Sequence, residues 1–378
     1  MKKNTCLIYS WENFSFNYLQ KDVGLFPKFF AKSSEQKLDA IIYDSVGLEG
    51  KLDEDFDGEL YKSKSYLHFI FEIFSNRIGY IKSVKYFILF HVSLRTSLLS
   101  ILLKLVNPSS KIIVKTDLSV SNLHAFSNMR MRNPIKYYLI LILNRVVDAF
   151  CIETTGVIEL LNLEHSNLIK RDKVYHVPNG VLPDDLFLKS VVKDEHSISI
   201  ITRDDTLLKG YDRIIPILKQ LDRNLSCAQQ GYVVDVRIIG PLSVEMRNAL
   251  SEVSKDLSKI DIHLLGSLSA KSTLAELSKS QLFVNLSLEE SYCFALVEAA
   301  LTKCTVITTP VGVAEDLSKH YPSIEILNFN VESFVQCIIS NLENSQVKIT
   351  DSILAEKKTY DWEKLVEGFY IEFSKVNK

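Results

Sequence analysis

One stretch constrains the fold of this chain more than any other, residues 282–317, LFVNLSLEESYCFALVEAALTKCTVITTPVGVAEDL. Leu282–Ser287 and Cys304–Thr309 are short apolar or β-branched runs, which predict strands buried on both faces. Between them, Phe294–Leu301 is apolar enough to predict a helix with little polar surface. Because strands that alternate with helices form parallel sheets, this stretch indicates an α/β fold.

Two glutamates stand out in this apolar setting. Glu290 lies in the loop before the predicted helix, and Glu298 is the only charge in the helix before Lys303. A carboxylate on so apolar a helix is costly to bury unless it is hydrogen-bonded, so we expect Glu298 to face a polar cleft. The free N–H groups at the helix start form an anion site. Alternatively, Ser287-x-x-Glu290 fits a capping box, which would make Glu290 structural.

The segment Glu290-Ser-Tyr-Cys-Phe-Ala-Leu-Val-Glu298, followed by Thr-Val-Ile-Thr-Thr-Pro-Val-Gly312, resembles the Glu-(seven residues)-Glu signature of the family-four retaining glycosyltransferases. These enzymes have the α/β GT-B fold, in which two Rossmann-like domains with parallel sheets face each other across a cleft. The resemblance implies that Glu290 touches the donor sugar and that Glu298 holds the ribose of the sugar nucleotide. The loop and helix start between them, expected next to the donor, comprise Ser291, Tyr292, Cys293 and Phe294. Cys293 stands where relatives usually have Gly.

Length and sequence pattern predict two domains and a final helix. At 378 residues the chain accommodates two domains of ordinary size. His176-Val-Pro-Asn-Gly180 resembles the turn at which relatives leave their first domain, and Val181–Glu195 reads as a linker. Tyr360–Tyr370 resembles the family's closing helix. We therefore predict an acceptor-side domain over 1–180, a nucleotide-sugar domain over 181–358, and a helix over 359–378 that crosses back to the first domain.

Cysteine use and charge narrow the class of protein. The six cysteines lack metal-ligand or disulfide spacing, which suits a reducing cytoplasm. The apolar run after Met1-Lys-Lys is too short for a signal peptide and reads as a first strand. Residues 1–180 carry 23 Lys and Arg against 18 Asp and Glu, and the remainder carries 21 against 28. Without aromatic–basic clustering, this modest basic excess does not predict nucleic-acid binding.

The segment Met129–Val147 places Arg130, Arg132, Lys136 and Arg145 beside the apolar core Tyr137–Leu143. That core is too short to span a bilayer. Basic side chains beside apolar ones suit an anionic lipid surface, which would place the protein at the inner face of the membrane. A buried helix with a basic end explains the same pattern.

In the first half, strands are predicted at Thr5–Ser10, Asp39–Asp44, Tyr86–His91, Lys111–Asp117, Asp148–Glu153 and Val174–Pro178, with an acidic loop at Lys51–Glu59. His91 and the pair Thr116-Asp117 end neighbouring strands, so we expect them at a ligand-binding sheet edge. The resemblance implies a His near the donor sugar where Thr116 stands; Asp117 or His124 could take that role. Gly24, within Val23–Pro27, occupies the place of the family's glycine-rich loop near the donor.

In the second half, strands are predicted at Ser197–Thr202, Val233–Ile239, Ile260–Leu265, Leu282–Ser287 and Cys304–Thr309. Arg203-(five residues)-Lys209-Gly resembles the family's Arg…Lys-Gly element, in which both cations hold the donor diphosphate. Charge-assisted hydrogen bonds of this kind contribute about 1.5–3 kcal/mol each. The alternative is a basic loop before an amphipathic helix. Gly240 and Gly266 directly follow strands, and the second turn lies beside the base in relatives.

Together these features predict a glycosyltransferase that moves a hexose from a nucleotide diphosphate sugar, with UDP favoured, to a glycan or lipid-linked acceptor in cell-surface polysaccharide synthesis. Retention of configuration is implied by resemblance alone. No Asp-x-Asp pair lies at a strand end in the second half, and Asp204-Asp205 adjoins the phosphate-binding cations, so we expect no metal or other cofactor. The alternatives are a sugar-nucleotide epimerase and a catalytically silent GT-B scaffold.

Overall fold

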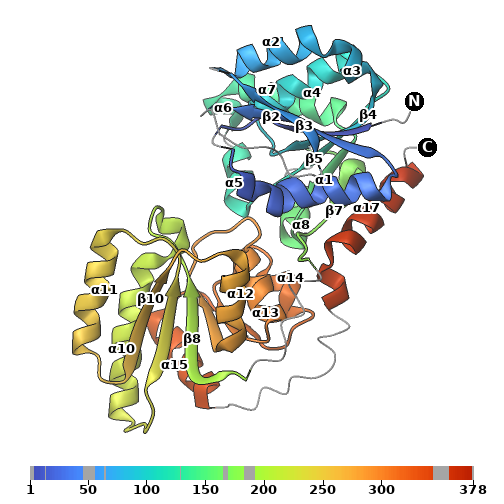
Figure 1. Cartoon of the computed structure of the whole chain (residues 1–378). Helices are drawn as coiled ribbons and strands as arrows, with labels where there is room; N and C mark the ends of the chain where they lie inside the picture. Colours follow the sequence, from blue (N-terminus) through green and yellow to red (C-terminus); the bar gives the residue numbers. More distant parts are fainter. Residues whose placement is uncertain are drawn as a thin grey trace. The chain divides into compact units, whose positions relative to one another are not determined.

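The computed structural model describes residues 4–12, 14–45, 56–63, 65–127, 129–164, 169–182, 192–343 and 357–376. The chain divides into two compact units (Figure 1). The first unit comprises Met1–Gly180 and Tyr360–Lys378, and the second comprises Val181–Thr359. The last helix, α17 (Trp362–Val376), therefore belongs to the first unit although the whole second unit precedes it in sequence.

The first unit is built on a parallel sheet that, in its described part, has seven strands in the order β3-β2-β1-β4-β5-β6-β7. The strands are β1 (Asn4–Tyr9), β2 (Lys37–Asp44), β3 (Asp57–Lys62), β4 (Val84–Phe90), β5 (Lys111–Lys115), β6 (Ala149–Ile152) and β7 (Val174–His176). The helices besides α17 are α1 (Asp22–Ser33), α2 (Tyr66–Asn76), α3 (Ile78–Ser83), α4 (Leu94–Val106), α5 (Val120–Ser127), α6 (Met129–Arg132), α7 (Pro134–Val146) and α8 (Thr155–Glu164).

The second unit repeats the design with, in its described part, six parallel strands in the order β10-β9-β8-β11-β12-β13. They are β8 (Asp194–Ile201), β9 (Val234–Ile239), β10 (Ile260–Gly266), β11 (Ser280–Asn285), β12 (Thr305–Thr308) and β13 (Ile324–Ile326). Its helices are α10 (Ile214–Cys227), α11 (Val244–Asp256), α12 (Ala270–Lys279), α13 (Phe294–Leu301), α14 (Ala314–Ser318) and α15 (Val331–Glu343).

Each strand order reverses direction once, between β1 and β4 in the first sheet and between β8 and β11 in the second. Ligands of open α/β sheets bind outside the carboxyl ends of the strands at such a switch point. The parallel α/β architecture predicted from the alternating apolar runs is confirmed, and each predicted strand overlaps an observed one.

Two edge strands, β3 and β13, were not predicted from the sequence. The predicted loop Lys51–Glu59 is wrong over Asp57–Glu59, which begins β3 and pairs in parallel with β2; residues 51–55 lie outside the described part. Edge strands carry charged residues that oppose further strand pairing, so their composition resembles that of a loop. β13 has three residues, too few to show a pattern.

Helix α17 is anchored to the first unit by aromatic packing against α1. Phe369 lies 5.9 Å, between ring centroids, from both Phe26 and Phe30, and 5.1 Å from Tyr175 of β7. Gly180 lies so close to this helix that a Cβ atom there would approach the backbone nitrogen of Trp362 to 2.8 Å. Burial of these rings explains why the end of the chain returns to the first unit.

The glycine-rich loop expected around Gly24 is wrong, because Gly24 is a buried residue in the first turn of α1. A Cβ atom at this position would lie 2.0 Å from the carbonyl oxygen of Leu19. Close backbone packing at the start of the helix therefore accounts for the glycine.

Serine side chains fix the start of several helices. Ser93 Oγ accepts a hydrogen bond from Thr96 N at the start of α4, and Ser243 Oγ accepts one from Met246 N at the start of α11. Ser65 and Ser269 cap α2 and α12 in the same way. Each cap satisfies an N–H group that the helix leaves without a partner, and its loss typically lowers stability by about 1 kcal/mol.

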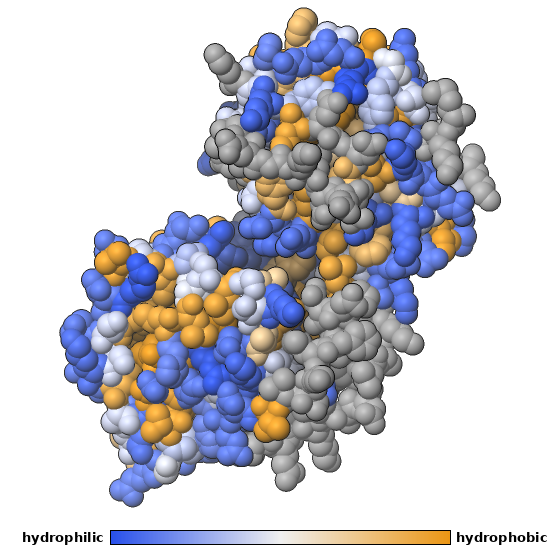
Figure 2. All heavy atoms as spheres, in the orientation of Figure 1, coloured by the Kyte–Doolittle hydropathy of each residue, from blue (hydrophilic) through white to orange (hydrophobic). Residues whose placement is uncertain are grey.

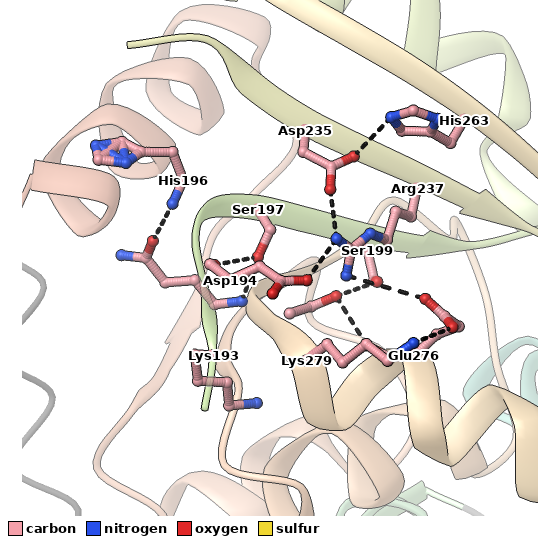
Figure 3. A network of polar contacts seen from close by, with 12 residues as sticks. Lys193, Asp194, His196, Ser197, Ser199, Asp235, Arg237, His263, Glu276 and Lys279 are labelled. Carbon is pink, nitrogen blue, oxygen red and sulfur yellow. Dashed lines mark hydrogen bonds and ion pairs between the residues drawn. The ribbon is translucent and has the colours of Figure 1, made fainter. Parts of the chain in front are cut away.

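Arg237 of β9 organises a charged network toward the amino ends of the second sheet (Figure 3). Its guanidinium pairs with Asp194 at 2.6 Å and with Asp235, and His263 Nε2 lies 3.2 Å from Asp235. The Arg237 side chain is 13% exposed. The two carboxylates neutralise the charge of Arg237. The network joins β8, β9 and β10 near the amino ends of the strands.

Hydrophilic and apolar side chains are mixed over both units on the face drawn in Figure 2. The segment Met129–Val147 is divided at Asn133, which caps α7 by accepting from Lys136 N. Helix α7 buries Ile140 and Leu143 but exposes Ile135, Tyr138 and Ile142. The alternative of a buried helix with a basic end therefore holds for only one side of α7. No helix among the described residues is long and apolar enough to cross a membrane.

Candidate functional site

The two loops at the switch point of the second sheet bring Lys209 and Glu290 together. Lys209 Nζ lies 2.7 Å from both carboxylate oxygens of Glu290. The side chains are 26% and 12% exposed, so the pair is accessible but largely desolvated. Strands β8 and β11 are neighbours in the sheet, and open α/β sheets bind ligands between the loops that follow such strands.

The backbone around Lys209 is fixed by a short 3₁₀ turn, Leu207–Lys209, that Thr206 caps by accepting from Leu208 N. Gly210 follows at φ +63°, where a Cβ atom would lie 1.9 Å from the Leu286 carbonyl oxygen. Leu288 N donates to the Leu208 carbonyl at 2.8 Å. These contacts hold the loop after β8 against the loop after β11, so the Lys209–Glu290 pair rests on docked backbone rather than on side chains alone.

The predicted capping box at Ser287-x-x-Glu290 is wrong. Helix α13 begins at Phe294 with Cys293 as its N-cap residue, and Ser287 Oγ instead donates to Glu290 Oε1 at 2.8 Å. Glu290 therefore lies outside the helix and receives hydrogen bonds from a hydroxyl and an ammonium. Its carboxylate is oriented by these contacts, and it does not cap the helix.

Cys293 adopts the left-handed conformation, with φ +70°, at the start of α13. A non-glycine residue in this region is strained, which explains why a Gly is usual here in the family that the motif resembles. Burial raises the pKa of the Cys293 thiol, and the charge of Glu290 raises it further, so the side chain is a neutral thiol.

Tyr292 is buried, and its carbonyl accepts from Val313 N at 2.8 Å. A Cβ atom on Gly312 would lie 2.2 Å from the same carbonyl oxygen. The turn after β12 therefore supports the loop that leads into α13, where Ser291 and Phe294 are partly buried.

Two other predicted donor residues, Arg203 and Gly266, lie at the carboxyl ends of strands of the second sheet, and Glu298 lies on α13. Glu298 is half-buried on α13, Arg203 follows β8 with half of its side chain exposed, and Gly266 ends β10 at φ +66° with no atom within 4 Å of an added Cβ. Arg203 Nε pairs with Asp205 at 3.1 Å. Of the two cations, Lys209 is thus the better ordered by its surroundings.

Asp204 has a structural partner. Both of its carboxylate oxygens accept from Ser243 N, at 3.0 and 2.9 Å, and the hydrogen bond with Ser243 lowers the pKa of Asp204. This contact ties the loop after β8 to the start of α11. Among the described residues, no group of three or more His, Cys, Asp or Glu side chains could hold a metal ion.

The carboxyl edge of the first sheet carries a second set of polar residues. His91 Nδ1 lies 2.6 Å from Asp117 Oδ1, as their places at the ends of β4 and β5 suggested. Thr116 is buried, and its hydroxyl donates to the Cys151 carbonyl at 3.2 Å. His124 is exposed on α5. The imidazole that joins Asp117 is therefore that of His91.

A buried ion pair beneath His91 and Asp117 was not predicted from the sequence. Lys115 Nζ lies 2.9 Å from Glu153 Oε1, which also accepts from Asn179 Nδ2 at 2.8 Å. The Lys115 and Glu153 side chains are 1% and 3% exposed. Burial raises the pKa of Glu153, whereas the Lys115 charge lowers it. A lysine and a glutamate at the ends of two apolar strands were the signal, because such charges are buried only in pairs.

Comparison with known proteins finds relatives of this chain in sequence and in fold. Residues 186–357 match the family described as "Glycosyl transferases group 1". A subunit of the human phosphatidylinositol N-acetylglucosaminyltransferase is 30% identical over 200 residues, which cover 50% of this chain and 39% of that protein. The chain thus matches about two fifths of the length of this curated relative.

The whole chain is similar in fold to solved glycosyltransferase structures. WaaG, a glycosyltransferase involved in lipopolysaccharide biosynthesis, has a TM-score of 0.66 at 14% identity and covers 97% of this chain and 98% of its own. Anabaena Alr3699/HepE in complex with UDP has a TM-score of 0.68 at 13% identity and covers 99% and 100%. The family match and these folds together support a transferase. Residues 186–357 therefore resemble the glycosyl transferases group 1 family, within a chain that has the GT-B fold of these solved structures.

Proposed function

We propose that this protein is a retaining glycosyltransferase that moves a hexose from a nucleotide diphosphate sugar, UDP-sugar favoured, to a glycan or lipid-linked acceptor in cell-surface polysaccharide synthesis. The observation that carries the proposal is the Lys209–Glu290 pair at the switch point of the second sheet, within the residues that match the glycosyl transferases group 1 family. The bound UDP of Alr3699/HepE supports a uridine donor, and the involvement of WaaG in lipopolysaccharide biosynthesis supports a surface polysaccharide.

In this proposal Lys209 and Arg203 hold the donor diphosphate, together with the N–H groups at the start of α13. As the bond between the sugar and the diphosphate breaks, its electron pair leaves with the diphosphate, and these groups stabilise the added charge. The acceptor oxygen forms the new bond to the same carbon, and its proton passes to the departing diphosphate oxygen. Glu298 holds the ribose, and Glu290 stabilises the positive character that the sugar ring gains.

The Lys209–Glu290 contact gives this assignment a physical basis. Without donor, the ammonium has a carboxylate as its counter-charge at 2.7 Å. A diphosphate carries more negative charge than one carboxylate, so it competes for the same ammonium and leaves Glu290 free to face the sugar. Glu290 therefore keeps Lys209 extended toward the position that we propose for the phosphate.

The test is release of nucleoside diphosphate from UDP-, GDP- and ADP-sugars in the presence and absence of a lipid-linked glycan acceptor. Acceptor-dependent release from one of them is expected, with the anomeric configuration of the product determined by NMR. Release without acceptor incorporation would favour the epimerase, and no release would favour the silent scaffold. Turnover is expected to persist in EDTA; full loss that Mg²⁺ or Mn²⁺ restores would contradict the metal-free assignment.

We further propose that helices α6 and α7 rest on an anionic membrane surface. Met131, Ile135 and Tyr138 are 86%, 74% and 53% exposed, and Arg132 and Arg145 are exposed on the same two helices. Apolar side chains flanked by cations are typical of surfaces that bind lipid headgroups. Since salt screens such attraction over about 10 Å at 0.1 M, sedimentation with anionic vesicles should fall as salt rises. A protein that stays in the supernatant at low salt would contradict the proposal.

A further inference from the structure

Lys193 lies directly before β8, at the amino edge of the second sheet (Figure 3). Its ammonium donates to the carbonyls of Leu277, at 3.1 Å, and Thr302, at 2.8 Å. The same group donates to Sγ of Cys304 at 3.6 Å. These acceptors precede β11 and β12, which follow β8 in the order of the sheet. One side chain thus joins the amino ends of three adjacent strands.

The three contacts match the three N–H donors of a lysine ammonium. Burial lowers the pKa of Lys193, because the charge is partly removed from water. Burial also raises the pKa of Cys304, so its side chain is a neutral thiol, which donates to the Leu277 carbonyl at 3.0 Å. Lys193 therefore belongs to a desolvated polar cluster and is not a lysine exposed on the surface.

Two of the acceptors lie at the ends of helices. Leu277 is in the last turn of α12, and Thr302 is the C-cap residue of α13. The last carbonyls of a helix have no partner within the helix and carry its partial negative charge, so a cation is favourable there. Lys193 therefore fixes the ends of α12 and α13 to the start of β8.

Helix α13 depends on this end for its position. Within the described part of the chain, the side chain of its N-cap residue, Cys293, makes no capping hydrogen bond, so it does not compete with a ligand for the first N–H groups. The side chains that α13 buries are all apolar, and apolar packing is not directional. Hydrogen bonds are directional, so those at the C-terminal end determine where the helix lies along its axis.

Thr302 connects Lys193 with Glu298. The N–H group and the hydroxyl of Thr302 both donate to the Glu298 carbonyl, at 2.9 and 2.8 Å. Lys193 holds the carbonyl of the same threonine. Successive hydrogen bonds therefore join the ammonium to the residue that, in the proposed function, holds the ribose of the donor.

We infer that Lys193 is a positioning residue for donor binding, which holds α13 so that Glu298 and the N–H groups at the helix start meet the donor. The inference rests on the proposed function and adds a residue that acts through the helix rather than by touching the donor. Helix α13 has eight residues and is about 12 Å long. Because so short a helix moves as a rigid body, a shift at its end displaces its start.

The test is calorimetric titration of UDP, GDP and ADP into the full chain and into Lys193→Met, which keeps an unbranched side chain and removes the three donors. The Kd of the nucleoside diphosphate that the wild type binds should rise at least fivefold. The donor KM should rise with it and kcat should change less, since Lys209 and Glu290 lie on loops outside α13. A Kd within twofold of the wild type would overturn this inference alone, whereas a wild type that binds none of the three would overturn the proposed function itself.

The matched control is Lys173→Met in the first unit. Lys173 Nζ donates to the carbonyls of Asn144, Arg145 and Val147 at the C-terminal end of α7, at 2.8, 3.3 and 2.6 Å. It thus has the same structural role on a helix that carries no donor residue. Both variants should have a lower melting temperature, but Lys173→Met should bind nucleoside diphosphate within twofold of the wild type. An equal loss of affinity in both would attribute the effect to general destabilisation and overturn the inference.

A double-mutant cycle with Glu298→Gln tests whether Lys193 acts through Glu298. Residues that act through one another are not additive, so Lys193→Met should weaken binding by a smaller factor in the Glu298→Gln protein than in the wild type. Equal factors in both proteins would overturn the inference. Should Lys193→Met not fold, Thr302→Val takes its place in both measurements, because it removes the hydroxyl bond to the Glu298 carbonyl and retains the ammonium.

Discussion

The carboxyl edges of the two sheets use the same place in the fold in different ways. In the second unit, Lys209 and Glu290 are 26% and 12% exposed, and both lie on loops after their strands. In the first unit, the corresponding cation, Lys115, is 1% exposed at the end of β5 and is paired with a buried carboxylate. The second edge offers a cation to a ligand, and the first keeps its cation inside.

The difference in exposure determines whether a ligand can reach the cation at each edge. Lys209, on a loop, can exchange its carboxylate for a diphosphate, because Glu290 keeps the hydrogen bond from Ser287 and remains partly exposed. Lys115 cannot do so without leaving Glu153 uncompensated in the interior. The accessible side chains of the first edge are His91 and Asp117, which are 22% and 51% exposed.

Lys209→Met should have the largest effect, on turnover. Removing a preorganised cation from a leaving group typically lowers kcat by about 100- to 1000-fold. Steady-state rates with a saturating UDP-sugar would measure it, with Lys219→Met on the exposed face of α10 as the control. A wild-type kcat in Lys209→Met would show that Lys209 does not take part in the chemical step.

Lys115→Met should instead act on stability. Breaking a buried pair by removing one partner lowers the free energy of unfolding by about 3–5 kcal/mol. The loss should shrink at acidic pH, because burial already raises the pKa of Glu153 and a protonated Glu153 needs no counter-charge. Urea unfolding measures this, and the double variant Lys115→Met/Glu153→Leu should recover much of the loss. A large fall in nucleoside diphosphate affinity in a folded Lys115→Met protein would break the distinction between the two edges.

The two glutamates of the second edge should differ in kinetics. Glu298→Gln removes a hydrogen bond to the ribose, a part of the donor that does not change during the reaction. The donor KM and the nucleoside diphosphate Kd should therefore rise, by a factor that corresponds to a loss of about 1–3 kcal/mol in binding free energy, with kcat nearly unchanged. Glu290→Gln should mainly lower kcat, and nucleoside diphosphate should bind as well or better, because Lys209 loses its carboxylate partner. If both variants have a lower melting temperature but normal turnover, both glutamates have a structural role only.

Asp235→Asn should have the smallest effect. It weakens the Arg237 network at the opposite edge of the second sheet, where the Asp235 side chain is 28% exposed (Figure 3). Arg237 keeps its ion pair with Asp194, so the melting temperature should fall only slightly while donor binding and turnover stay unchanged. A clear loss of donor affinity would show that charge anywhere in this unit matters, rather than charge at the carboxyl edge.

The strands and the second-unit motifs could be predicted because they are local in sequence. Apolar runs predicted β1, β4 and β11, and the spacing of Glu290 and Glu298 placed one in the loop and the other on α13. The contact between Lys209 and Glu290 could not be read from spacing, since it depends on the register of β8 and β11 and on the docking of Leu288 against Leu208.

Other errors arose where tertiary packing outweighs local pattern. Gly24 was interpreted as a ligand-binding glycine, but its small size is required by the Leu19 carbonyl. The Ser287-x-x-Glu290 spacing fits a capping box, yet the helix starts at Phe294 because Cys293 is held at a positive φ. The Lys115–Glu153 pair was missed because each charge alone resembles the end of a strand, and only the sheet shows that both are buried.

The most direct test of the central claim is calorimetric titration of UDP into the wild-type protein and into Lys209→Met, with GDP and ADP as alternatives. The wild type is expected to bind one nucleoside diphosphate, without added metal. Lys209→Met should bind it about 10- to 150-fold more weakly, which corresponds to the loss of a charge-assisted bond of about 1.5–3 kcal/mol. Equal affinity in both proteins, or no binding of any of the three by the wild type, would contradict a diphosphate site at the carboxyl edge of the second sheet.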